Sequence, residues 1–138
     1  MRLNLSSELS KILDVVRKEI KADQDLYIVG GAVRDVLLGR ELNDLDFVLS
    51  ENPTFLAKQV ARKLNAGFFV LDDERNTARV VYRRDGNHLF PLDFVKFTGK
   101  SLQSDLEHRD FTINAIAIQV KDLEKFIGFY QLSQVFKK

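Results

Sequence analysis

The residues best suited to chemistry in this sequence are two aspartates, Asp44 and Asp46, which are separated by a single leucine. On a β-strand, side chains two positions apart point to the same face, so the two carboxylates would lie together. A hard cation such as Mg²⁺ prefers oxygen ligands and is often bound beside substrate phosphates. An Asp-x-Asp pair is common in loops, however, and this pair gains meaning only from its neighbours.

A glycine pair, Gly30 and Gly31, lies upstream between an apolar β-type run at residues 26–29 and a helical pattern at residues 32–38. The backbone N–H groups at such a strand–glycine–helix junction favour an anion such as a phosphate. Arg34 adds a charged donor for the same phosphate. A tight turn with a solvated arginine is the alternative interpretation. The sequence lacks the third glycine of a dinucleotide-binding fingerprint and the Gly-Lys-Ser/Thr ending of a P-loop, which excludes those two classes.

A third carboxylate, Asp93, alternates with Leu92 and Phe94, so on a strand it faces away from both. It is either a further metal ligand or base, or part of the solvent face of an edge strand. Pro91 in the same segment favours an edge position or a bulge. The residues alone leave both interpretations of the carboxylate open.

Two arginines, Arg79 and Arg83, lie four positions apart on the strand predicted at residues 77–83, and therefore on one face. They form either an ordinary polar sheet face or a local cationic surface for RNA phosphates.

The apolar pattern predicts an α+β protein with one first helix, several strands and a second long helix. Leu9, Ile12, Leu13, Val16 and Ile20 recur at helical spacing and predict an amphipathic first helix. Asn52 and Pro53 begin the second long helix as its cap and first residue. Strands are predicted at residues 26–29, 44–49, 67–71, 77–83 and 89–95, the last three as a β-meander. A short helix at residues 101–106 and a helical turn running into a strand at residues 110–118 follow.

Composition limits the function classes. The 138 residues, 45% of them hydrophobic, suffice for one domain with its own core. The absence of cysteine excludes disulfides, zinc-thiolate sites and thiol nucleophiles, and fits a reducing compartment such as the cytoplasm. No apolar run approaches the ~18 residues of a membrane span, so we expect a soluble protein without a membrane partner. A net charge of +1 provides no general attraction for nucleic acid, so contact with RNA requires a local patch.

Three segments together resemble one family. They are LYIVGGAVRDVLLG at residues 26–39, DLDF at residues 44–47 and HRDFTINAIA at residues 108–117. The chain resembles the head domain of bacterial class II CCA-adding tRNA nucleotidyltransferases and of bacterial poly(A) polymerases, in the DNA polymerase beta superfamily. The resemblance implies the nucleotidyltransferase fold, a mixed and mostly antiparallel β-sheet flanked by helices. It also implies Mg²⁺-dependent transfer of AMP or CMP from ATP or CTP to the 3′ end of RNA, with tRNA as the expected acceptor.

The resemblance assigns roles to particular residues. It implies that Asp44 and Asp46 bind the catalytic Mg²⁺ ions, and that a third carboxylate comes from a later strand, for which Asp93 is the candidate. It implies contact with the incoming nucleotide by five further residues: Gly30, Gly31, Arg34, Arg109 and Asp110. One departure is His108, which stands where the family has the first arginine of its Arg-Arg-Asp motif.

We expect residues 1–138 to form a single head domain, with an N-terminal helix at 1–24, a catalytic core at 25–120 and a tail at 121–138. Relatives continue into a helical neck, whose Glu-Asp-x-x-Arg motif selects the base, and into domains that hold the tRNA. This sequence contains no such motif, so a separate neck and body polypeptide is an expected partner. The alternative is a non-catalytic nucleotide- or RNA-binding module, inactive without the neck. A minimal transferase acting on a protein or small molecule is disfavoured by the segment at residues 109–117.

Overall fold

The computed structural model describes residues 7–21, 24–29, 35, 41–74, 76–84, 88–96 and 117–119. Within these ranges the helices and strands follow one another as α1 (Ser7–Glu19), β1 (Leu26–Val29), β2 (Leu45–Leu49), α3 (Pro53–Leu64), β3 (Gly67–Asp72), β4 (Thr77–Arg83), β5 (Leu89–Lys96) and β6 (Ala117–Gln119). Of the helix predicted at residues 32–38, Asp35 alone is described, and its backbone is helical.

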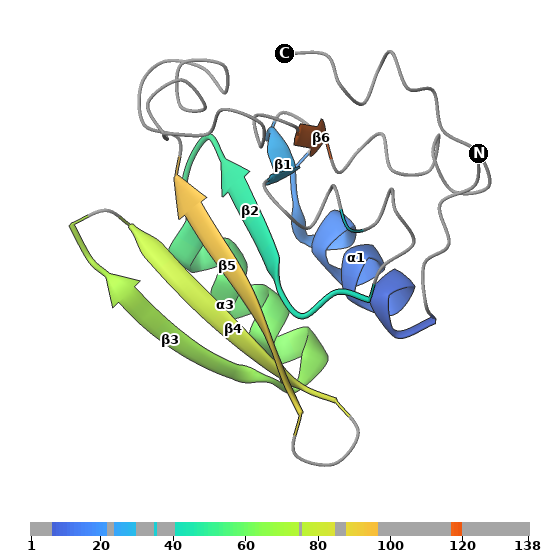
Figure 1. Cartoon of the computed structure of the whole chain (residues 1–138). Helices are drawn as coiled ribbons and strands as arrows, with labels where there is room; N and C mark the ends of the chain where they lie inside the picture. Colours follow the sequence, from blue (N-terminus) through green and yellow to red (C-terminus); the bar gives the residue numbers. More distant parts are fainter. Residues whose placement is uncertain are drawn as a thin grey trace.

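The strands form one six-stranded sheet in the order β3-β4-β5-β2-β1-β6 (Figure 1). Among the strand pairs described, β2 and β5 run parallel and the other four pairs run antiparallel. The predicted meander at β3, β4 and β5 is confirmed, as is the prediction of a mixed, mostly antiparallel sheet flanked by helices. The meander brings β5 back between β4 and β2, which places two distant parts of the chain side by side.

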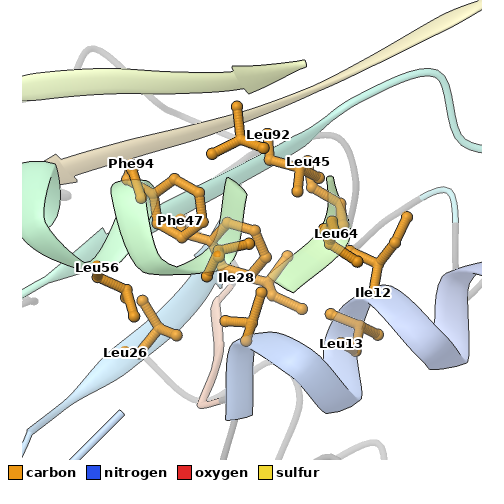
Figure 2. Close-up of a cluster of buried hydrophobic side chains, with 14 of the residues drawn as sticks. Ile12, Leu13, Leu26, Ile28, Leu45, Phe47, Leu56, Leu64, Leu92 and Phe94 are labelled. Carbon is orange, nitrogen blue, oxygen red and sulfur yellow. The ribbon is translucent and has the colours of Figure 1, made fainter. Parts of the chain in front are cut away.

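The hydrophobic core lies between one face of this sheet and the two helices. Alternation along the strands sends every second side chain to that face, as in β4, where Ala78 and Val80 are buried. The helices meet the sheet with apolar stripes, which include Ile12 and Val16 of α1 and Val60 of α3, all 0% exposed. Figure 2 shows the side chains of both helices and the strands meeting in this core. No helix that the structure describes is long and apolar enough to cross a membrane.

Two phenylalanines hold the parallel pair together at the centre of the core. Phe47 of β2 and Phe94 of β5 are partners in the register, and both are fully buried. Their rings stack with centroids 4.9 Å apart and planes inclined by 13° (Figure 2). Phe47 directly follows Asp46, and Phe94 directly follows Asp93. The ring contact therefore also fixes the backbone at the two aspartates.

One local expectation is wrong. Pro91 lies in an interior strand, and the irregularity in the meander falls in β3 between Val70 and Asp72. An interior proline is tolerated here because the pairing with β2 begins only at Leu92, so Pro91 has a paired neighbour on the β4 side alone. Asn52 does occupy the N-cap position of α3, but its side chain makes no capping hydrogen bond.

A partly buried arginine, Arg84, ties α1 to the sheet. Its Nε donates to Glu8 Oε1 of α1 at 2.6 Å, and its Nη1 donates to the backbone carbonyl of Leu42 at 2.9 Å. The guanidinium carbon lies 4.1 Å from the centroid of the Phe90 ring, which gives a cation–π contact. One side chain therefore joins the first helix, the segment before β2 and strand β5.

Replacing this arginine should loosen all three elements. We expect Arg84→Ala to lower the free energy of unfolding by about 2 kcal/mol, because it removes a charge-assisted hydrogen bond and a cation–π contact together. Urea unfolding followed by circular dichroism measures the change. Arg83→Ala is the matched control, since Arg83 is the exposed neighbour at the end of β4. Equal losses for the two variants would show that the contacts of Arg84 contribute nothing specific.

Candidate active site

Strand pairing aligns one row of side chains across the face of the sheet that points away from the core. The row runs from Phe69 on β3 through Arg79, Asp93 and Asp46 to Val29 on β1. Directly paired residues share a face, and neighbouring strands are ~4.8 Å apart. Three charged residues from three adjacent strands are therefore neighbours, although they are distant in sequence.

The two aspartates of the Asp-x-Asp pair lie at the start of β2. Leu45 and Phe47 are buried at 1% and 0% exposure, and they fix the strand so that the partly buried Asp46 points to the opposite face. Asp44 lies one residue before the strand and is exposed. The burial of Leu45 and Phe47 therefore explains why the side chain of Asp46, between them, lies on the face opposite the core.

The third predicted carboxylate, Asp93, is the register partner of Asp46 on the adjacent strand. It faces away from Leu92 and Phe94, as predicted, and both of these are fully buried. Its strand is interior, so the interpretation of Asp93 as the solvent face of an edge strand is wrong. The fold brings Asp93 beside the Asp-x-Asp pair.

Asp93 makes a two-pronged ion pair with Arg79 of β4. Arg79 Nε donates to Oδ1 at 2.7 Å and Nη2 donates to Oδ2 at 3.0 Å, while the side chains are 40% and 22% exposed respectively. This fork-to-carboxylate geometry is the strongest arrangement for such a pair. The charge of Arg79 is therefore engaged inside the row, and Arg79 is not the open cationic surface for RNA that was one interpretation of the sequence.

The electrostatic field of the acidic residues reaches this arginine. The hydrogen bond to Asp93 raises the pKa of Arg79 above its ordinary value, and burial opposes that rise. The charge of Asp93 and, more weakly, those of Asp46 and Asp44 raise the pKa further. Arg79 is thus the ion-pair partner of Asp93, and the charges of Asp46 and Asp44 act on it more weakly.

The donor chemistry of this group fits a hard divalent cation. Asp44 and Asp46 offer carboxylate oxygens from positions two residues apart. Mg²⁺ is usually bound by such carboxylates together with the phosphates of the substrate. Over the described ranges, no three acidic or histidine side chains converge closely enough to hold an ion together. The carboxylate of Asp93 is instead bonded through both oxygens to Arg79.

The remaining predicted site residues lie outside the described residues. They are Gly30, Gly31, Arg34, Arg109 and Asp110. The structure therefore brings together Asp46 and Asp93, with Asp44 beside them, and does not test the nucleotide-binding set.

The pairing of Arg79 with Asp93 is the feature that sequence reasoning missed. Both residues were singled out, but as members of separate features. A signal was present in the predicted meander, because a hairpin centred on Gly86 pairs position 79 with position 93. The register of β4 and β5 follows this rule through Arg83 and Leu89.

Comparison with known proteins identifies close relatives. The family described as the Poly A polymerase head domain matches residues 26–131. The chain is 44% identical over 92 residues to a CC-adding tRNA nucleotidyltransferase of Geobacter sulfurreducens, covering 67% of this chain and 21% of that protein. It is 35% identical over 147 residues to a CCA-adding enzyme of Streptococcus mutans, covering 97% of this chain and 36% of that protein. The chain thus spans only about a fifth to a third of the length of these relatives.

Solved structures agree with the sequence relatives. A Thermotoga maritima CCA-adding enzyme complexed with tRNA superposes with a TM-score of 0.70 at 29% identity, covering 91% of this chain and 29% of that one. A CCA-adding enzyme in complex with CTP superposes with a TM-score of 0.71 at 30% identity, covering 90% of this chain and 28% of that one. The family match covers well over half of the chain, and several relatives exceed 30% identity. The chain belongs to the Poly A polymerase head domain family.

Proposed function

We propose that this chain is the catalytic head of a tRNA nucleotidyltransferase, which transfers AMP or CMP from ATP or CTP to the 3′ end of RNA. The observation that carries the proposal is the alignment of Asp46 with Asp93 on adjacent strands, beside Asp44 and on the face opposite the core. The names of the relatives, and solved complexes of CCA-adding enzymes with ATP and with CTP, support this choice of reaction and substrates. Addition of CCA and addition of poly(A) both remain within the proposal.

The proposed cofactor is Mg²⁺, held by Asp44 and Asp46 with Asp93 as third carboxylate. A bound Mg²⁺ would supply a Lewis acid for the α-phosphate and neutralise charge on the departing pyrophosphate. Asp44 and Asp46 would hold the cation at the start of β2, and without one their negative charge would repel a triphosphate. The 3′-hydroxyl of the RNA is the proposed nucleophile. Nucleotide contacts are proposed for Gly30, Gly31, Arg34, Arg109 and Asp110.

The proposed partners are the nucleotide, a tRNA 3′ end, and a neck and body region that selects the base. A cytoplasmic location is proposed because the sequence has no cysteine and the relatives are named for action on tRNA. The alternative is a non-catalytic module that binds nucleotide or RNA, and the engagement of both Asp93 oxygens by Arg79 favours it.

Nucleotide transfer by the 138-residue chain tests the proposal against this alternative. We expect Mg²⁺-dependent binding of ATP or CTP in calorimetry, and incorporation of labelled nucleotide into a tRNA transcript that lacks its terminal CCA. Incorporation that appears only after a neck-containing polypeptide is added would also support the catalytic role. Binding without incorporation under both conditions would favour the binding module. Absence of Mg²⁺-dependent nucleotide binding would contradict the catalytic role and a nucleotide-binding module alike.

A further inference from the structure

Asp93 lies on an interior strand, with a charged neighbour on each adjacent strand on the same face of the sheet. On one side is β2 with Asp46, its register partner, and on the other side is β4 with Arg79, its partner in the antiparallel pair. A cation shared with Asp46 would draw the carboxylate toward β2. The fork of Arg79 draws it toward β4, because it engages Oδ1 and Oδ2 at 2.7 and 3.0 Å.

In the structure, the carboxylate of Asp93 is directed toward Arg79 of β4. Both oxygens of Asp93 are bonded to the guanidinium, and the described carboxylates do not converge as a set of three. A bidentate guanidinium–carboxylate contact fixes direction as well as charge. For Asp93 to join a cation on the β2 side, it must give up at least part of this contact.

We propose that Arg79 is a built-in counter-ion that competes with a divalent cation for Asp93. This inference rests on the proposed function, in which Asp44 and Asp46 hold the metal. The guanidinium lowers the mutual repulsion of the three carboxylates when no metal is bound. It also lowers the affinity of the site for a metal alone, because binding must displace an existing ion pair.

Manganese binding to the 138-residue chain without nucleotide tests the inference, with isothermal calorimetry as the readout. Arg79→Gln should tighten Mn²⁺ binding about fivefold, since the pair is partly exposed and its strength is near the upper end for such pairs. Arg83→Gln is the matched control, because it removes the same charge from the same face of β4 further along the strand. This control should change the affinity less than twofold.

A double-mutant cycle separates direct competition from a general field effect. In an Asp93→Asn background, Arg79→Gln should leave Mn²⁺ affinity unchanged, because the competing contact is already lost. Equal tightening in the two backgrounds would overturn the inference. Unchanged or weaker binding in Arg79→Gln alone would also overturn it, since weaker binding would mean that Arg79 orients Asp93 for the metal.

Two further measurements keep the outcomes distinguishable. Arg79→Lys keeps the charge but loses the fork, so it should tighten Mn²⁺ binding by a smaller factor and serves if Arg79→Gln does not fold. An affinity equal to or weaker than that of the unaltered chain would again count against competition. Asp46→Asn should abolish Mn²⁺ binding. If Asp46→Asn binds Mn²⁺ as tightly as the unaltered chain, the proposed metal site is wrong. If Asp46→Asn loses Mn²⁺ binding but Arg79→Gln does not tighten it, only the proposed competition is wrong.

Discussion

Asp46→Asn, and separately Asp44→Asn, are expected to lower the rate of nucleotide transfer by about a thousandfold or more, which corresponds to ~4 kcal/mol of transition-state stabilisation. Asparagine keeps the size of aspartate but loses the charge that attracts a divalent cation. Asp46 lies in the row with Asp93, and Asp44 lies exposed just before the same strand. Single-turnover incorporation of labelled nucleotide into a tRNA lacking CCA measures the effect, with the neck-containing polypeptide present if the chain needs it.

The matched control is Asp14→Asn, which makes the same chemical change on α1. Asp14 pairs with Arg17 at 2.7 Å and Lys18 at 3.1 Å within its own helix. Both basic side chains lower the pKa of Asp14, Lys18 most strongly, so this carboxylate is charged at neutral pH. The control should retain transfer within about twofold, as expected for a surface change. If both site variants transferred nucleotide as fast as the control, Asp44 and Asp46 would have no catalytic role.

Phe47→Ala is expected to have the largest effect on stability, a loss of ~3–5 kcal/mol in the free energy of unfolding. The ring is fully buried, and it stacks on Phe94 with centroids 4.9 Å apart. Truncation leaves a cavity and removes the aromatic contact between β2 and β5. For a domain of this size the melting temperature should fall by on the order of 10 °C, which differential scanning fluorimetry can follow.

Phe55→Ala provides the same truncation at an exposed position of α3, where the side chain is 61% exposed. It should change the free energy of unfolding by less than about 0.5 kcal/mol. A third variant, Phe47→Leu, retains most of the buried volume and should lose less than Phe47→Ala. If Phe47→Ala melted like Phe55→Ala, the stacked pair would not be a main source of stability for the parallel contact.

The elements that could be predicted are those that short-range periodicity specifies. The helical spacing of Ile12 and Val16 predicted α1, and the β-type runs at residues 77–83 and 89–95 predicted strands of the meander. The direction of Asp93, away from Leu92, followed from the same period of two. These predictions succeed because the burial of one face imposes the pattern locally.

The features that could not be predicted depend on how distant strands pair. Pro91 predicts an edge position or a bulge because proline cannot donate to a ladder, yet β5 is interior because β2 pairs with it from Leu92 onward. The ion pair of Arg79 with Asp93 needed the register of a hairpin, and the proximity of Asp46 needed a parallel pairing across the chain. Periodicity shows which face a residue occupies, whereas topology decides its neighbours on that face.

The parallel pairing of β2 with β5 has a consequence for how the chain matures as it is synthesised. Strand β2 is made early, but its partner follows only after α3, β3 and β4. Until β5 emerges and inserts between β4 and β2, one side of β2 has no strand to pair with, and Asp46 has no carboxylate beside it from β5. Non-local pairing of this kind is slow because a long loop must close first. Asp46 and Asp93 therefore become neighbours late, and the metal site proposed for them could be completed only after most of the sheet has formed.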